Sequence, residues 1–503
     1  MHQKYGPVVR MAPNYLDLDY DTCASLIKTC FDTKGVWRKY GILQTEWHAV
    51  SGFKVGKETR YNIFSEVRPV EHSRMKKPVA KYWTTSAVGR MEPHIDSVVA
   101  FFAKQLQDRY ADGIEGKMGK AFDFGDWAMF FAWDAVSKTT MSKRIGYLDH
   151  GNDFDGTLAT AVKASKYLVT IGMYPVLDKF LEKNPVYRIG PPSYTTIAML
   201  AVKLLTDRLT GKDGHDSEAQ PDFMDHYIEA QKQYPDIVDD TMVISCKLSI
   251  PNYKEEMTIR GHLDGVQAND VNPILIDILV NLAAGADTSA AALRTIFYLC
   301  LKDRAVWTKL SEAVLAAPFA QPGNVQLPAP YSQTRGIPYL EAVIREALRL
   351  YPGNLFPQER VVPAGGLKLP DGRFVPEGTT LGFNAYVMHR NKAIWGPNAE
   401  EFRPERFLRS EDESEAAFNE RMRLYNDSDL SFGAGSRKCI GMNLAMMEVY
   451  KSVATLVAMF DFELATQDDW TVKAELFPRA TGIVCRIRQR AGMVLREDID
   501  YSS

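Results

Sequence analysis

The stretch from Leu430 to Tyr450, LSFGAGSRKCIGMNLAMMEVY, constrains this 503-residue chain more than any other. It places one cysteine, Cys439, after two basic residues and just before an apolar helical pattern. Because cations and a helix N-terminus both stabilise a thiolate, the pattern predicts a lowered thiol pKa. The surrounding glycines permit a tight turn and a close approach of the backbone to a flat group. An inert buried thiol ahead of a core helix is the alternative.

Composition excludes several classes of protein. Hydrophobic residues make up 46% and charged residues 24% of the chain, which is typical of a globular protein with a sizeable core. The net charge of -3 gives no reason to expect nucleic acid as a partner. The six cysteines include no C-x-x-C, which argues against a disulfide scaffold, a zinc site or covalently attached haem.

Helical periodicity dominates the chain. The longest apolar run, Ile274–Leu301, could span a bilayer, but it carries Asp277, Asp287 and Arg294. Each of these is costly at mid-membrane, so we expect a buried helix of a large soluble fold. Shorter β signals occur in GPVVRMA near the start and as a strand, turn and strand within 361–383. The expected fold is mainly α with a smaller β-rich part.

The residues around the cysteine form the pattern F-x-x-G-x-R-x-C-x-G, with Phe432, Gly435, Arg437, Cys439 and Gly441 in order. This pattern resembles the haem-binding loop of the cytochrome P450 family. The resemblance implies that Cys439 is the metal ligand, binding the iron of haem b as a thiolate. It also implies that Arg437 meets a haem propionate, that Phe432 packs against the loop with Gly435, and that Gly441 leaves a gap for the macrocycle.

Two further motifs follow the family order. Glu346 and Arg349 lie three apart in IPYLEAVIREALRLYP, and Arg406 lies in FRPERF. Taken alone, the first pair would be a routine surface ion pair. The resemblance implies instead a buried Glu-Arg-Arg network that holds the cysteine loop.

The apolar run contains AAGADTSA, in which Ala284, Gly285, Asp287 and Thr288 match the family's A-G-x-D-T. Glycine inside a helix is unfavourable, and a groove for O2 would give it a purpose. The resemblance implies that Asp287 and Thr288 are catalytic and relay protons to bound oxygen. A solvated Asp beside a Thr bonded back to its own helix is the alternative.

Other positions are implied more loosely by the resemblance. His72 and Lys76, four residues apart, match a helix that contacts haem propionates, and Arg360 matches another propionate-binding arginine. A structural histidine and a strand-edge arginine are the alternatives. The substrate is expected to meet a mostly apolar set of side chains: Ala284, Leu355, Phe356 and Thr481. The identity of the substrate cannot be read from them.

The whole chain, 1–503, is expected to form a single cytochrome P450 domain, most similar to fungal microsomal members of the benzoate para-hydroxylase and pisatin demethylase type. The resemblance implies a monooxygenase that inserts one atom of O2 into an apolar or aromatic small molecule, in fungal secondary metabolism or detoxification of aromatic compounds. Electrons would come from NADPH through NADPH-cytochrome P450 reductase, docked near basic residues such as Lys438.

Two features depart from the family pattern. The chain starts beyond the point where such proteins have their membrane anchor, which suggests a truncation, an incomplete gene model or an unanchored form of a protein of the endoplasmic reticulum. Its candidate for peripheral membrane contact is the apolar surface from Tyr174 to Val186. The stretch 246–273 lacks helical periodicity and is expected to be an insertion before the long apolar run.

Two rival functions remain open at this point. A reductase-independent haem-thiolate isomerase or dehydratase would act on a peroxide, but it would have little use for Asp287 and Thr288. A non-catalytic haem protein from a defective gene model would also explain the missing anchor and the insertion.

Overall fold

The structure is a computed structural model that describes residues 1–21, 23–31, 46–55, 58–111, 117–184, 189–190, 195–237, 274–466 and 468–501. The expected insertion at 246–273 lies outside the described residues, as does the end of the apolar stretch from 174 to 186.

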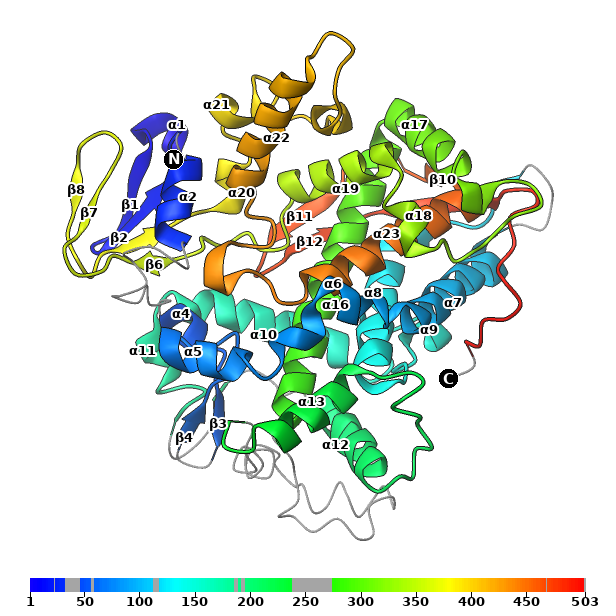
Figure 1. The fold of residues 1–503 in the computed structure, drawn as a ribbon, viewed down its shortest axis with the longest axis horizontal. Helices are drawn as coiled ribbons and strands as arrows, with labels where there is room; N and C mark the ends of the chain where they lie inside the picture. The colour runs from blue at the N-terminus through cyan, green and yellow to red at the C-terminus, as the bar shows by residue number, and fades with distance from the viewer. Residues whose placement is uncertain are drawn as a thin grey trace.

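Helices form most of the described chain (Figure 1). The longer ones are α7 (Glu92–Tyr110), α8 (Phe124–Met141), α10 (Thr157–Gly172), α12 (Thr195–Leu209), α13 (Phe223–Gln233), α16 (Ile274–Lys302), α17 (Arg304–Leu315), α19 (Pro338–Leu350), α22 (Glu415–Ser428) and α23 (Met442–Met459). The shorter ones are α1 (His2–Tyr5), α2 (Cys23–Phe31), α4 (Glu46–Ala49), α5 (Pro69–Lys76), α6 (Thr85–Gly89), α9 (Tyr147–His150), α11 (Pro175–Asp178), α18 (Tyr331–Thr334), α20 (Ala385–Met388) and α21 (Lys392–Trp395). Single 3-10 turns are η1 (Ala80–Trp83), η3 (Pro318–Ala320), η4 (Pro404–Phe407) and η5 (Gly435–Arg437).

Helix α16 runs through the middle of the helical part and packs along α8 (Figure 1). It is the apolar run that the sequence predicts to be a buried helix. Aromatic side chains fill the space beside it: the ring centroids of Phe124 and Phe297 are 4.3 Å apart, and those of Phe297 and Phe462 are 5.0 Å apart. Burial of each such ring contributes about 1.5–3 kcal/mol, so this core fixes the position of α16.

The strands form several small sheets. The largest has the order β1-β2-β9-β6, with β1 (Val8–Ala12), β2 (Tyr15–Leu18), β9 (Thr380–Gly382) and β6 (Arg360–Val361). Another joins β10 (Phe460–Leu464), β13 (Val484–Gln489) and β5 (Phe122–Asp123). Two-stranded sheets pair β3 (Phe53–Val55) with β4 (Glu58–Arg60), β7 (Leu367–Lys368) with β8 (Phe374–Val375), and β11 (Thr471–Ala474) with β12 (Pro478–Thr481).

The sheet that contains β6 matters most for the site. It brings the N-terminal strands beside the segment that follows α19, and it has its own buried hydrophobic cluster with α2 and α22. The strand near the start and the antiparallel β7–β8 hairpin confirm the β signals of the sequence. The mainly α fold with a smaller β-rich part is therefore confirmed.

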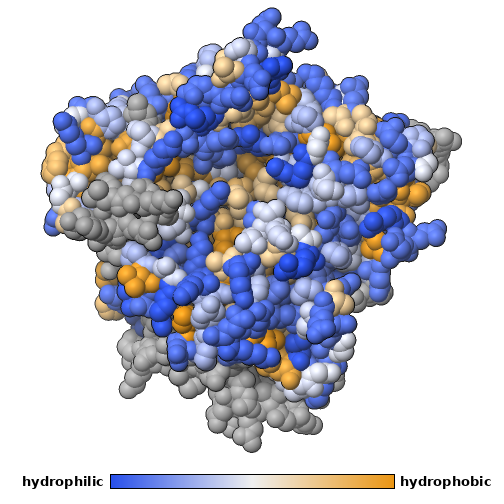
Figure 2. Space-filling model, viewed as in Figure 1, coloured by the Kyte–Doolittle hydropathy of each residue, from blue (hydrophilic) through white to orange (hydrophobic). Residues whose placement is uncertain are grey.

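The surface viewed in Figure 2 is mostly hydrophilic, with apolar residues scattered in small groups. Among the described residues, no helix combines the length and the apolar character needed to cross a bilayer.

Candidate active site

The cysteine loop lies between α22 and α23. The backbone N–H of Cys439 donates to the carbonyl of Phe432 at 2.8 Å, and the N–H of Lys438 donates to that of Gly435 at 3.2 Å. Gly435 has a φ of 64°, and a Cβ there would come within 1.8 Å of the Phe31 carbonyl oxygen in α2. A side chain at this position would therefore displace α2, so packing against α2 by itself requires a glycine here, and its place in the haem-binding pattern stays a prediction.

Gly441 stands next to the cysteine side chain. A Cβ at this position would lie 4.0 Å from the Cys439 Sγ and 3.5 Å from the Trp83 ring. Both are ordinary contact distances, so a small side chain would fit here, and the gap for a macrocycle stays a prediction.

The surroundings of Cys439 do not lower its thiol pKa as the sequence pattern predicts. Burial raises the pKa of the thiol, although the N–H groups of Gly441 and Met442 and the charges of Lys76 and Lys438 act in the opposite direction. The prediction of a lowered pKa is therefore wrong for the protein alone. A bound metal ion would deprotonate a coordinating thiol outright, so thiolate ligation remains consistent with this site.

The charge of Arg437 in the cysteine loop acts on three basic side chains: His72 and Lys76 of α5, and Arg360 of β6. Burial, followed by the charges of Arg437 and Lys76, lowers the pKa of His72 to about 3. Burial and the charge of Arg437 also lower the pKa of Lys76, and they lower that of Arg360 to about 10. The structure thus brings together all four residues for which the sequence suggested propionate binding.

The donors of this basic group fit an anion. The Nη2 atom of Arg437 is buried without a hydrogen-bond partner among the described residues, and burial lowers the pKa of its guanidinium to about 10. Lys76 donates to the carbonyl of Ser436 at 3.2 Å, which ties α5 to the cysteine loop. The charge of Glu66 favours the charged form of this guanidinium, but the Nη2 donor still lacks a partner among the described residues, so a carboxylate such as a haem propionate suits the Arg437 side chain.

Arg360 is anchored more firmly. It is 6% exposed, donates to the carbonyl of Glu359 at 2.7 Å, and places its guanidinium carbon 4.0 Å from the centroid of the Phe31 ring. It is a buried residue at the start of β6, the edge strand of its sheet, so it is a strand-edge arginine whose side chain is shielded from solvent, and propionate binding stays a prediction.

On α16, Asp287 and Thr288 face different partners. Burial raises the pKa of Asp287 to about 6, although the indole N–H of Trp133 donates to its carboxylate at 3.4 Å. The Thr288 hydroxyl donates to the carbonyl of Ala284 at 2.9 Å. Asp287 is thus held against α8 rather than solvated, while Thr288 is bonded back to its own helix.

The need for glycine at position 285 is explained by helix packing, which the sequence did not show. A Cβ at this position would lie 2.9 Å from Cγ2 of Val136 in α8. The glycine therefore permits close packing of α8 and α16, and a groove for O2 is not needed to explain it.

Glu346, Arg349 and Arg406 form the buried network that the sequence predicts. Arg349 donates to both carboxylate oxygens of Glu346, at 2.7 and 2.8 Å, and Arg406 donates to the same carboxylate at 3.2 Å. Glu346 is 0% and Arg349 1% exposed. The backbone N–H of Arg403 adds another donor at 2.9 Å. The network joins α19 to the segment around η4.

The segment after α19 lies against α16 at Thr288. A Cβ on Gly353 would stand 3.7 Å from the Thr288 side chain. Phe356, three residues on, stacks on Trp47 of α4 with ring centroids 5.9 Å apart. Leu355 and Phe356 are partly buried, whereas Ala284 and Thr481 are exposed.

Sequence reasoning missed several residues that contact these groups. Trp133 holds Asp287, and Glu448 of α23 accepts a hydrogen bond from Ser289 of α16 at 2.7 Å. Burial raises the pKa of Glu448 to about 8. The sequence signal that could have identified Glu448 is its position as a lone acid in the apolar pattern LAMMEVY.

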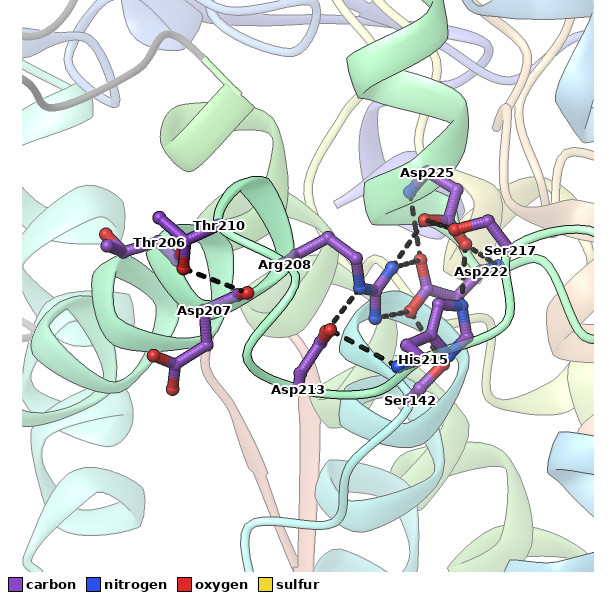
Figure 3. A network of polar contacts seen from close by, with 10 residues as sticks. All are labelled: Ser142, Thr206, Asp207, Arg208, Thr210, Asp213, His215, Ser217, Asp222 and Asp225. Atoms are coloured by element: carbon purple, nitrogen blue, oxygen red, sulfur yellow. Dashed lines mark hydrogen bonds and ion pairs between the residues drawn. The ribbon is translucent and has the colours of Figure 1, made fainter.

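One other cluster among the described residues has metal-ligand chemistry: His215, Asp222 and Asp225 (Figure 3). The guanidinium of Arg208 donates to Asp222 at 2.9 Å and to Asp225 at 2.5 Å. Because this cation already occupies the cluster, we interpret it as an ion network that joins α12 to α13.

The fold and the cysteine loop define a haem-thiolate protein, and comparison with known sequences establishes the family. A sequence model of the cytochrome P450 family matches residues 1–486, so the chain belongs to that family. It is 52% identical over 501 residues to the cytochrome P450 monooxygenase cfoH of Aspergillus candidus, covering 99% of this chain and 84% of that protein.

More distant relatives are also cytochrome P450 monooxygenases. One from Aspergillus terreus is 31% identical over 471 residues, covering 92% of this chain and 84% of the relative. The monooxygenase mpaDE of Penicillium roqueforti is 28% identical over 494 residues, and the chain spans only 52% of its length. The protein is thus a fungal-type cytochrome P450 monooxygenase, an oxidoreductase whose family uses haem with a cysteine thiolate and electrons from a redox partner.

Proposed function

We propose that Cys439 binds the iron of haem b and that Arg437, His72, Lys76 and Arg360 hold the haem propionates. The observation that carries this proposal is the buried Nη2 of Arg437, which has no partner among the described residues and lies in the cysteine loop, where the charge of Arg437 acts on Lys76 and Arg360. When bound, the haem supplies the redox chemistry of O2 activation, which a thiolate ligand favours.

Asp287 and Thr288 of α16 would transfer protons during the reaction. Asp287 has a pKa of about 6, raised by burial, so it can hold and release a proton near neutrality. Thr288 supplies a hydroxyl that can exchange its hydrogen bond to Ala284 for one to a bound oxygen. This supports transfer of one oxygen atom from O2 to the substrate over an isomerase function.

The substrate would be an apolar or aromatic small molecule. Ala284 lies one turn before Thr288, Leu355 and Phe356 follow Gly353, which packs beside Thr288, and the Trp47 ring stacks on Phe356. Such side chains favour flat apolar ligands over charged ones. Its relatives are fungal monooxygenases, which supports a role in fungal secondary metabolism or in detoxification of aromatic compounds.

Electrons would come from NADPH through NADPH-cytochrome P450 reductase. An open groove of about 770 Å³ lies beside the cysteine loop, between α2 and the end of α22. Lys28 and Lys438 line it, together with Asp427 and Asp429. Lys28 is paired with Asp427 at 2.6 Å, whereas Lys438, next to Cys439, is exposed and would meet an acidic group of the reductase.

Peripheral contact with the endoplasmic reticulum membrane would involve the region around α11. Tyr174, Val176 and Phe180 are 69%, 58% and 64% exposed, and Met173 and Leu177 are also exposed. A contiguous group of exposed apolar side chains fits contact with a membrane or another protein.

Oxygen consumption by the purified protein, mixed with NADPH and the reductase, tests this function. We expect NADPH-dependent O2 uptake that a suitable aromatic compound accelerates and that Cys439→Ala abolishes. A protein that binds haem but consumes no O2 with any of a broad panel of aromatic compounds would favour the isomerase or non-catalytic alternatives.

A further inference from the structure

His389 lies between the Glu-Arg-Arg network and the cysteine loop. It is 0% exposed and directly follows α20. Its Nδ1 atom is 2.9 Å from the carbonyl oxygen of Arg349, and its Nε2 atom accepts a hydrogen bond from the backbone N–H of Leu430 at 2.9 Å. The imidazole therefore joins the end of α19 to the first residue of the loop.

The contact with α19 is reciprocal. While the His389 ring faces the carbonyl of Arg349, the guanidinium of Arg349 donates to the carbonyl of His389. The same guanidinium is held by Glu346. Because both directions of this contact are buried, a shift of α19 would carry His389 with it.

Both backbone polar groups of Leu430 are hydrogen-bonded to side chains. His389 accepts from its N–H, and the side chain of Gln358 donates to its carbonyl at 3.0 Å. The N–H of Gly433 donates to the same carbonyl at 3.0 Å, and the carbonyl of Phe432 then accepts from the N–H of Cys439. A short run of backbone hydrogen bonds thus leads from Leu430 to the cysteine.

The two contacts require one form of the imidazole. Nε2 must be unprotonated to accept from Leu430, so the proton lies on Nδ1, where it meets the Arg349 carbonyl. Burial lowers the pKa of His389, as do the charges of Arg349 and Arg390, whereas the Asp429 carboxylate, 3.6 Å from Nε2, acts in the opposite direction. The edge of the Trp395 ring packs on the imidazole, with centroids 5.7 Å apart.

We infer that His389 is a positioning residue for Cys439: its neutral imidazole couples the Glu346–Arg349 network to the peptide of Leu430 and so fixes the loop that presents the thiolate. The inference rests on the proposed role of Cys439 as haem ligand. Through His389, the Glu-Arg-Arg network is connected to the cysteine loop by hydrogen bonds.

Two substitutions separate the two contacts of the ring. His389→Gln places an amide oxygen near the position of Nε2 and can still accept from Leu430 N–H. His389→Asn places an amide nitrogen near the position of Nδ1 and can donate to Arg349, but it leaves Leu430 without an acceptor. His94→Gln is the matched control, because His94 is also buried and lies in α7, away from the loop.

The measurements are the ferrous carbon monoxide spectrum and hydrogen exchange of residues 430–440 in the haem-free protein. We expect His389→Asn to raise exchange in the loop, and the ratio of non-thiolate to thiolate spectrum, by about tenfold, because a buried N–H loses its acceptor. His389→Gln should restore both values to within about threefold of the parent protein. His94→Gln should leave both unchanged.

Equal behaviour of the Asn and Gln variants would contradict the inference, since a merely space-filling histidine does not distinguish them. If neither variant folds, the exchange rate of the Leu430 N–H in the parent protein decides: strong protection supports its hydrogen bond to His389, and exchange as fast as that of an exposed amide overturns the inference. If the parent protein gives no thiolate spectrum, the role of Cys439 is wrong, while the exchange data still decide whether His389 holds the loop.

Discussion

Asp287 and Thr288 are adjacent in the chain, but the structure gives them separate environments. The carboxylate of Asp287 meets the Trp133 indole, whereas the hydroxyl of Thr288 is bonded to the carbonyl of Ala284. In the described residues, no hydrogen bond joins the two side chains. Asp287 is thus suited to store a proton and Thr288 to present one to the exposed stretch at Ala284.

At this scale, Thr288→Ala should uncouple electron use from product formation. Removing the hydroxyl leaves no donor at this position for bound oxygen, so peroxide released per NADPH oxidised should rise several-fold while haem content stays normal. The measurement is peroxide and product per NADPH in the reductase-coupled assay. Thr295→Ala, a buried threonine on the same helix, is the control. Unchanged coupling in Thr288→Ala would exclude the hydroxyl from the relay.

At the scale of elements, α16 and α23 meet through the hydrogen bond from Ser289 to Glu448. Burial raises the pKa of Glu448 from its ordinary value of 4.5 to about 8, so the folded protein keeps this carboxyl protonated at neutral pH. The unfolded chain ionises it above about pH 4.5. Stability contributed by this group is therefore present in acid and lost as the pH rises toward 8.

Glu448→Gln removes this titration and should stabilise the protein increasingly with pH. Between pH 5.5 and 7.5, the difference in unfolding free energy between variant and parent should grow by about 1 kcal/mol per pH unit. Denaturant unfolding at several pH values measures it. Glu463→Gln, an exposed acid on β10, should show no such trend. A difference that is flat with pH would mean that Glu448 is already ionised in the fold.

The Glu-Arg-Arg network belongs to α19 and η4. Glu346→Ala would leave Arg349 charged, buried and without its carboxylate, which should cost about 3–5 kcal/mol of unfolding free energy and much of the bound haem. Denaturant unfolding and haem content measure the two effects. Glu341→Gln, one turn earlier on the same helix, should change neither much. Normal haem content in Glu346→Ala would contradict a role of the network in holding the loop.

Local patterns predicted these elements well, because α16, α19 and the cysteine loop each carry their signal within a short stretch. The residues that contact the site residues could not be predicted from local patterns, because they are distant in the sequence. Trp133 is far in sequence from Asp287, and Val136 of α8, which explains Gly285, becomes a neighbour only when α8 packs on α16. The pKa of Cys439 was mispredicted for a related reason: the sequence shows the nearby cations but not the burial that outweighs them.

At the scale of the whole molecule, the site is assembled from segments distributed along the chain. Helix α5 supplies His72 and Lys76, strand β6 supplies Arg360, and the loop before α23 supplies Arg437 and Cys439. The small sheet and the α8–α16 core hold these segments in place. The single-domain organisation expected for 1–503 agrees with a site that draws on both ends of the chain, and it stays a prediction.

The carbon monoxide difference spectrum of the purified, dithionite-reduced protein tests the central claim most directly. Because the position of the Soret band depends on which protein group binds the iron, we predict the strongly red-shifted band of thiolate ligation, and its loss in Cys439→Ala. A band at the position typical of histidine or neutral thiol ligation, or a protein that takes up no haem, would contradict it.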